Sequence, residues 1–261
     1  MDIGTGLTVL GATKLLEKLL GPSFDYLGAG LKDWAERRSE NVKRIFAAAA
    51  ERLGPQLEQP GGVPPKLLRG VLLEGSFCED PLGAEYFGGV LASSRTTDPS
   101  DDRGATYLDL VAHLSTYQLR THYVFYSLVH RLFTGSTIPI SDAEGRIHLG
   151  VFIPGSYAAL VEGGSGDSAE VLVSHSIFGL ARHDLVGAQF HFGSAQYLAK
   201  QYPKIPGEGL VAFPSVLGVE LFLWAHGLGH LAVNQFLRAS IPPLEGMSIP
   251  DGAQSLTSLV A

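Results

Sequence analysis

The chain lacks most of the features that identify a chemistry or a compartment. Cys78 is the only cysteine among 261 residues, so no disulfide can form within the chain, and a reducing cytoplasm is the expected location. No apolar run approaches the roughly 18 residues of a membrane span. The N-terminus has neither the cationic start nor the small-residue cleavage site of a secretory signal. These absences predict a cytoplasmic protein without disulfides.

Acidic side chains are concentrated toward the C-terminus. The formal net charge is −7, and residues 136–261 hold five basic and ten acidic side chains, whereas residues 1–60 are neutral. Such a balance repels phosphate backbones, which makes nucleic acid an unlikely partner. Hydrophobic residues make up 45% of the chain, and the mean hydropathy is +0.16. A chain of this length and composition can bury a substantial core.

Residues 22–53 predict one long helix. Pro22 fits a first helical turn, the apolar residues that follow recur three or four apart, and the Gly54-Pro55 pair ends the pattern. A linker rich in proline and glycine comes next, at 54–65. Shorter helices are then expected at 65–77, at 81–91 with Asp80 as its N-cap, at 105–113 and at 116–133. Residues 1–135 therefore predict a helical bundle organised around the long helix.

The pattern changes near residue 137, where β-prone pieces appear. Strands are expected at 138–140, 146–153, 188–192 and 210–213, with helices at 157–161, 168–183 and 214–225. Helix, strand, long hairpin loop, strand and helix is the order of a winged-helix-like module, assigned here to residues 136–235. Residues 236–261 have no periodicity and predict a loosely packed C-terminal tail. The expected fold class is α+β, mainly α.

Six side chains are candidates for contact with a partner: Leu16, Leu20, Trp34, Arg37, Arg38 and Trp224. The first two lie on an amphipathic segment at 13–20, which either packs on the long helix or lies against a membrane surface or partner. Acidic residues interleave with the two arginines, which favours a solvated ion-pair face. The last tryptophan ends an apolar helix and favours core packing, with a partner-binding patch as the alternative.

His226 and His230 are the weak candidates for a metal site. Four residues apart, they would share one face of a helix, a spacing that serves zinc in other proteins. Gly227 and Gly229 lie between them, and Glu220 precedes His226 by a spacing that faces elsewhere. Helix caps or packed histidines are the favoured interpretation, so no metal or cofactor is assigned.

Two further candidates for catalysis are considered. Ser174, His175, Ser176, His183, Asp184 and His191 would invite a serine hydrolase if they met in space, but no nucleophile-elbow motif occurs. Cys78 stands beside Glu79 and Asp80, acidic neighbours that would raise the pKa of its thiol and leave it unreactive. No catalytic residue is therefore assigned.

The order of several apolar and small-residue stretches resembles the bacterial abortive-infection alpha family (Abi-alpha-like proteins). The stretches are 18–25 (KLLGPSFD), 31–34 (LKDW), 64–68 (PPKLL), 72–76 (LLEGS), 79–80 (ED), 89–94 (GVLASS), 177–180 (IFGL) and 217–218 (LG). Together they cover most of residues 14–230. The resemblance implies a cytoplasmic protein of phage defence whose infected host stops growing, and it implies no catalytic residues. The insert at 194–209 and the tail after 241 lie outside the family's pattern.

The sequence thus predicts a non-enzymatic protein of antiphage defence that acts through an unidentified protein partner, with residues 1–20 as a candidate contact to a membrane surface. Two alternatives stay open: a metal-dependent hydrolase using His226 and His230, and a winged-helix nucleic-acid binder. The alanine run 47–50 offers a smooth surface for close helix approach, so a homo-oligomer is a further expectation.

Overall fold

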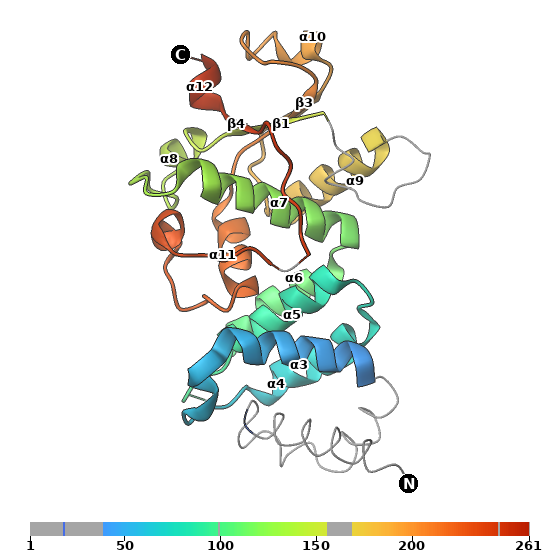
Figure 1. The fold of residues 1–261 in the computed structure, drawn as a ribbon, viewed down its shortest axis with the longest axis vertical. Helices are drawn as coiled ribbons and strands as arrows, with labels where there is room; N and C mark the ends of the chain where they lie inside the picture. The colour runs from blue at the N-terminus through green and yellow to red at the C-terminus, as the bar shows by residue number, and fades with distance from the viewer. Residues whose placement is uncertain (1–17, 19–38, 99, 156–168, 245, 261) are drawn as a thin grey trace. The chain divides into compact units, whose positions relative to one another are not determined.

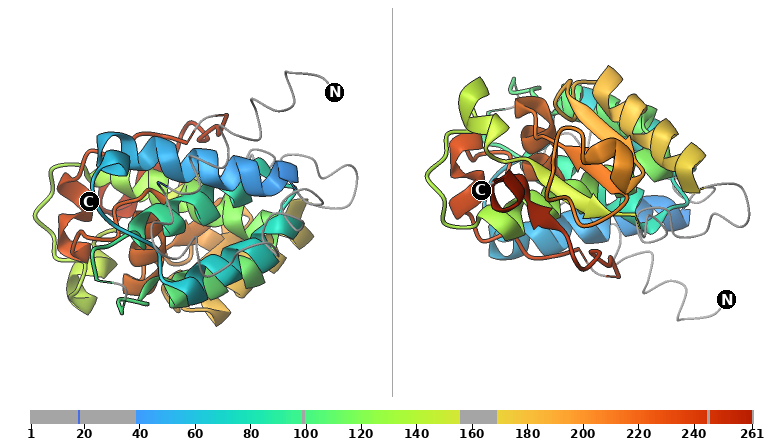
Figure 2. Two further views of the ribbon diagram at one scale, coloured as in Figure 1. Left: turned by 90° about the horizontal axis from the view of Figure 1, so that it is seen from below. Right: turned by 90° about the horizontal axis from the view of Figure 1, so that it is seen from above.

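The computed structural model describes Lys18 and residues 39–98, 100–155, 169–244 and 246–260. It divides into two compact units (Figures 1 and 2). Unit 1 consists of residues 1–113 and 223–230, and unit 2 of residues 114–222 and 231–261. The structure is mainly helical with one small antiparallel sheet, which confirms the α+β, mainly α class.

Four α-helices and two short 3-10 helices make up the described part of unit 1, apart from its C-terminal segment. They are α3 (Ser39–Leu53), η1 (Gly54–Glu58), α4 (Pro65–Glu74), η2 (Gly75–Phe77), α5 (Pro81–Ser93) and α6 (Gly104–His113). The helices expected between 65 and 113 are confirmed. Of the predicted long helix at 22–53, the segment 22–38 lies outside the described residues.

Helix α5 is the centre of unit 1. The Asp80 carboxylate caps its N-terminus by accepting from the Gly83 backbone N–H at 3.1 Å, and Pro81 occupies the first turn, as the sequence predicts. The helix is buried on nearly all sides because α3 and α6 both contact it. Gly88 allows the close approach of α3: a Cβ at this position would lie 2.6 Å from the Ala48 Cβ.

The predicted linker at 54–65 is held in place rather than free. Its first residues form η1, and Gly62 exchanges two backbone hydrogen bonds with Thr96, at 2.9 and 3.0 Å. The Arg95 guanidinium donates to the backbone carbonyls of Gln56, Leu57 and Gln59. A single arginine thereby contacts three carbonyl groups at the end of this short helix, one of which, that of Gln56, also accepts from the Gln59 N–H at 3.1 Å.

Unit 2 combines helices with the sheet. Its helices are α7 (Thr116–Phe133), α8 (Ala143–Ile147), α9 (Ala169–Arg182), α10 (Ala195–Leu198), η4 (Val233–Arg238) and α12 (Leu256–Val260), together with the first residues of α11 (Val216–Ala225). Its strands are β1 (Val151–Pro154), β2 (Phe190–Gly193), β3 (Gly209–Ala212) and β4 (Gln254–Ser255). The predicted order of helix, strand, hairpin loop, strand and helix is found in α9, β2, β3 and α11.

The sheet has the order β2-β3-β1-β4, with all neighbours antiparallel. Phe152, Val211 and His191 lie directly opposite one another across β1, β3 and β2, so their side chains share one face. On that face Phe152 and Val211 pack with Leu198 and with residues of α12. Figure 1 shows α10 and α12 on this side of the sheet and α7 on the other.

The core of unit 2 is built on α7 and contains a buried polar network. The Tyr126 hydroxyl donates to the Leu185 carbonyl at 2.8 Å and accepts from the Ser215 N–H at 3.1 Å. Ser215 in turn accepts from the Gly218 N–H at 2.9 Å, so it caps the start of α11. His122 is fully buried and bonds the Gly218 carbonyl at 3.1 Å. Because hydrogen bonds satisfy these groups, the network fixes the packing of α7 against α11.

One predicted strand is wrong, and another is predicted too long. Residues 138–140 form no strand, because Pro139 has no N–H to donate and the Arg146 guanidinium takes the Ile140 carbonyl at 2.7 Å. The strand predicted at 146–153 begins only at Val151, because the Asp142 carboxylate caps α8 by accepting from the Glu144 N–H at 3.4 Å. A local cap therefore outweighs the β propensity of the isoleucines.

The prediction of a loosely packed tail at 236–261 is also wrong for the described residues. Leu244 and Leu259 are buried, and β4 adds a strand to the sheet beside β1. The Leu244 N–H donates to the Tyr123 hydroxyl at 3.0 Å. Each of these contacts joins single residues far apart in the sequence, which is why no periodicity revealed them.

The boundaries of the two compact units differ from those of the three predicted segments, 1–135, 136–235 and 236–261. The division falls after His113, ahead of α7, so the longest described helix belongs with the sheet. Residues 223–230 return to unit 1, and the tail belongs to unit 2. The expected helix at 157–161 lies outside the described residues.

Candidate protein-interaction surface

Of the six residues predicted to contact a partner, the structure describes Trp224 alone. Its side chain is 6% exposed and stacks on the Tyr107 ring with centroids 4.5 Å apart. The Ser93 hydroxyl donates to the Trp224 carbonyl at 3.0 Å. Trp224 therefore lies in the core of unit 1, the location that its apolar neighbours favoured. Leu16, Leu20, Trp34, Arg37 and Arg38 lie outside the described residues.

His226 and His230 do not share a helical face. Helix α11 ends at Ala225, and Gly227 adopts a φ of +76° that turns the chain out of the helix. His226 is buried whereas His230 is exposed. In the described part of the chain, no three His, Cys, Asp or Glu side chains are grouped as metal ligands would be. The geometry on which the zinc hypothesis depended is absent there.

The serine and histidine residues considered for a hydrolase make separate contacts in the structure. The His175 Nε2 lies 3.2 Å from the Ser115 hydroxyl, which also accepts from the Gln118 N–H in the capping box of α7. Ser176 donates to the Leu172 carbonyl of its own helix, and the His191 ring lies beside tyrosines of the hairpin loop. Across residues 39–98, 100–155, 169–244 and 246–260, no carboxylate is seen to orient His175. These side chains form no triad.

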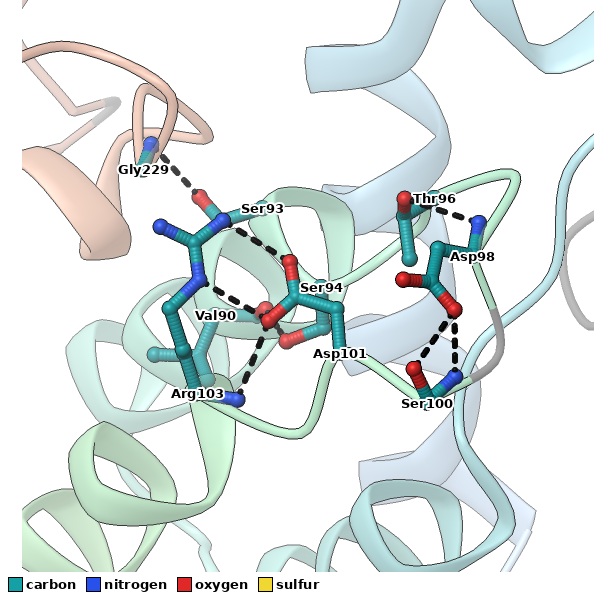
Figure 3. A network of polar contacts seen from close by, with 9 residues as sticks. All are labelled: Val90, Ser93, Ser94, Thr96, Asp98, Ser100, Asp101, Arg103 and Gly229. Atoms are coloured by element: carbon teal, nitrogen blue, oxygen red, sulfur yellow. Dashed lines mark hydrogen bonds and ion pairs between the residues drawn. The ribbon is translucent and has the colours of Figure 1, made fainter.

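A polar loop in unit 1 satisfies its own charged groups. In Figure 3, Asp98 accepts from the N–H and hydroxyl of Ser100, and Asp101 binds Arg103 through two contacts of 2.8 Å. These bonds lower the pKa of both carboxyl groups. In the same view Ser93 accepts from the Gly229 N–H at 3.1 Å. These hydrogen bonds and the ion pair hold the loop and the segment after α11 in place. The polar groups that form them already have partners within unit 1.

Cys78 has the inert thiol that the sequence predicts, although for a different leading reason. Burial is the largest cause, with the Asp80 charge second, and together they raise the pKa of the thiol to about 11. The Sγ atom donates to the Asp80 carbonyl at 3.5 Å. A protonated thiol is a poor nucleophile at neutral pH.

Helix α9 leaves part of its apolar side chains in solvent. Val173, Ile177 and Leu180 are buried, as a helix packed on one side requires. Val171 and Phe178, by contrast, are 62% and 53% exposed. Seven residues is close to two helical turns, so these two side chains lie along the same outward face. Isolated exposed apolar residues are common, but two aligned on one face form a surface.

The tight packing of α9 against α7 fixes where this outward face lies. At Gly179 an added Cβ would clash with the Gln118 side chain of the α7 capping box. The contact of His175 with Ser115 joins the same two helices one turn earlier. With these two points held, Phe178 cannot turn inward without breaking the α7–α9 contact.

Strand β2 extends the apolar face of α9. The Phe178 ring meets the Phe190 ring edge-on at 5.1 Å and the Phe192 ring at 6.2 Å. Both phenylalanines of β2 are half-buried. We call Val171, Phe178, Phe190 and Phe192 the α9–β2 patch. Figure 2 (right) shows α9 alongside the β2–β3 side of the sheet.

Sequence reasoning missed this patch although a signal was present. Val171 and Phe178 stand at helical spacing on the face opposite the buried residues, and Phe190 and Phe192 alternate around His191. These patterns predict a helix and a strand, but periodicity does not reveal which apolar face lacks a covering element.

None of the helices in the described residues is long and apolar enough to cross a bilayer. Comparison of the chain with protein-family models, curated proteins and solved structures found no match.

Proposed function

We propose that this chain is a non-enzymatic interaction protein that binds a protein partner through the α9–β2 patch. One observation carries the proposal: Val171 and Phe178 are mostly in solvent on a helix whose opposite face is fully packed. Aromatic side chains gathered at a solvent-facing site are enriched in protein interfaces. The phenylalanines of β2 give this site a rigid support.

The setting that we propose is bacterial antiphage defence. This part rests on the resemblance to the abortive-infection alpha family and, through it, on a cytoplasmic location. A binding surface without a catalytic cluster is compatible with a protein that signals infection by association. Contact of residues 1–20 with a membrane surface stays part of the proposal, on the basis of their amphipathic sequence alone.

We also propose that unit 2 is winged-helix-like. The element order from β1 through α9 to the β2–β3 hairpin supports this assignment, as does the position of β3 between β1 and β2. In such a module α9 would be the helix presented to a partner. Its outward Val171 and Phe178 favour a protein over DNA, because a helix that binds DNA presents basic and polar side chains to phosphates and bases.

A photo-crosslinking amino acid at position 178, in a bacterial host challenged with phage, tests the proposal. Position 147 provides the control, because Ile147 is apolar, 62% exposed and also in unit 2. We expect a discrete crosslinked protein from position 178 and none from position 147. Phe178→Glu should abolish protection against phage, whereas Ile147→Glu should retain it.

Equal protection by the two glutamate variants, at equal protein levels, would contradict the proposed function. Two further measurements address the alternatives. Stoichiometric zinc that is lost in His226→Ala would favour the hydrolase. DNA binding whose affinity falls steeply with salt would favour the nucleic-acid binder.

A further inference from the structure

Strand β2 is an open edge of the sheet. In the described part of the chain it pairs only with β3, so no described strand lies on the other side of its backbone. In an antiparallel pair, alternate residues point their N–H and C=O groups away from the partner strand. Among the described residues, no further backbone hydrogen bond involves Phe190, His191, Phe192 or Gly193.

The two edges of this sheet differ in how they are protected. Strand β4, at the opposite edge, has only two residues and offers little to pair with. Strand β2 has four residues and contains neither proline nor a charged side chain, the two devices that commonly block edge pairing. Its edge is therefore open to an added strand.

The side chains around β2 provide contacts for such a strand on both faces. On one face Phe190 and Phe192 adjoin Phe178 of α9. On the other, the His191 ring lies 6.5 Å from the Tyr197 ring and 5.9 Å from the Tyr202 ring. Because side chains of a strand alternate between faces, an added strand would meet aromatic rings with every residue.

The charges near this edge favour an acidic occupant. From the start of α9 to the loop after α10, residues 169–204 contain three basic side chains, Arg182, Lys200 and Lys204, and two acidic side chains, Glu170 and Asp184, in a chain of net charge −7. All three basic side chains are exposed. A second copy of the chain is disfavoured, because a two-fold axis would place this basic region against itself.

We infer that the open edge of β2 binds an acidic, extended segment of a partner protein as a fifth strand of the sheet. The inference rests on the proposed function, because it specifies the partner's conformation and charge. The bound segment would pair with β2 through its backbone, place apolar residues on the α9–β2 patch and direct carboxylates toward Lys200 and Lys204.

Fluorescence anisotropy of the full-length chain with a labelled peptide tests the inference. The probe is a peptide of about seven residues in which glutamate alternates with valine or phenylalanine. Two N-methylated versions are compared, one on odd and one on even residues. We expect one version to lose roughly tenfold or more in affinity, because it lacks the N–H groups that pair with β2, and the other to bind like the parent.

Charge variants make the second part of the test. Replacing the glutamates of the peptide by lysine should weaken binding, as should Lys200→Glu with Lys204→Glu in the chain. Arg238→Glu is the matched control, because Arg238 is an exposed basic residue of unit 2 on η4. It should leave the affinity unchanged.

Three results would overturn the inference: no saturable binding of the acidic peptide, equal binding of both N-methylated versions and the parent, or tighter binding of a single-stranded oligonucleotide. Loss of phage protection in Phe178→Glu with no peptide binding would retain the proposed function and reject strand pairing. Peptide binding by the chain together with unchanged phage protection in Phe178→Glu would retain strand pairing and reject the proposed function.

Discussion

Helices α5 and α9 are both rich in apolar residues, but they differ in how much of their surface is buried. Helix α5 is contacted by α3 and α6, and its residues from Leu82 to Ala92 are nearly all buried. Helix α9 packs closely against α7 and keeps Val171 and Phe178 largely in solvent. The difference lies in how many elements cover each helix rather than in its own composition. In the described part of the chain, the apolar side chains on the outward side of α9 are the ones that we propose bind a partner.

The largest expected effect on stability comes from adding a side-chain atom at Gly89, where α5 packs against its surroundings. A Cβ at Gly89 would overlap the backbone carbonyl of Ala225, which cannot move without shifting the end of α11. We expect Gly89→Ala to lower the free energy of unfolding by about 3 kcal/mol. Urea unfolding followed by the fluorescence of Trp224, which lies in the same unit, measures it.

Gly207→Ala is the control for this change, because a Cβ there meets nothing within 4 Å and the φ angle is ordinary. It should alter stability by less than about 0.5 kcal/mol. A Gly89→Ala variant as stable as the control would show that α5 is less tightly enclosed than we describe.

The second effect concerns the core that supports α9. Tyr126→Phe removes the hydroxyl that joins the Leu185 carbonyl to the Ser215 N–H, and both groups would be left buried without that partner. We expect a loss of about 2 kcal/mol in the free energy of unfolding. Far-ultraviolet circular dichroism during urea unfolding measures the change.

The same residue predicts a dependence on pH. Burial raises the pKa of Tyr126 far above its ordinary value of about 10. Above pH 10 the unfolded chain therefore releases a proton that the folded chain keeps, so this contribution to stability is complete below pH 10 and declines as pH rises. The slope is at most about 1.4 kcal/mol per pH unit. It should be absent from Tyr126→Phe; an identical slope in both proteins would assign it to other groups.

A smaller effect is expected on the open face of α9. Phe178→Ser removes the edge-on contacts with Phe190 and Phe192 and should cost no more than about 1 kcal/mol in stability. Ile177→Ala, one residue earlier and buried, should cost about 3 kcal/mol. Thermal unfolding of both variants measures the contrast, and similar losses would mean that the two faces of α9 are equally covered.

The smallest effect is on reactivity alone. Cys78 stands just before α5, and its raised pKa of about 11 keeps the thiol protonated near pH 8. We expect iodoacetamide to modify Cys78 at least roughly tenfold more slowly than a cysteine introduced as Ser174→Cys on α9. Mass spectrometry in the Cys78→Ser background distinguishes the sites. Equal rates in the folded protein would argue against a shielded thiol.

The elements that the sequence predicts correctly carry their signals locally. The Asp80-Pro81 pair identifies the start of α5, and Ser115 with Gln118 forms the capping box that starts α7. Helix α9 lies where the sequence predicts a helix, at 168–183. These patterns involve neighbouring residues, so a reading of the chain alone suffices to find them.

The parts that could not be predicted depend on contacts between distant residues. Leu244 is held by the Tyr123 hydroxyl and β4 by β1, and neither relation leaves a pattern near residue 250. The same limit hid the α9–β2 patch, because the exposure of Phe178 follows from the elements that surround it. Local sequence indicates that a residue is apolar, whereas the tertiary fold decides whether it is enclosed.

The path of the chain through α11 has a consequence for how the protein is made. Unit 1 includes residues 223–230, so a ribosome must translate as far as His230 before the segment that lies against Gly89 and Arg52 exists. Until then the nascent helices before residue 113 expose that side to solvent and to chaperones. Premature termination between residues 114 and 222 would thus release a chain in which neither unit can finish folding.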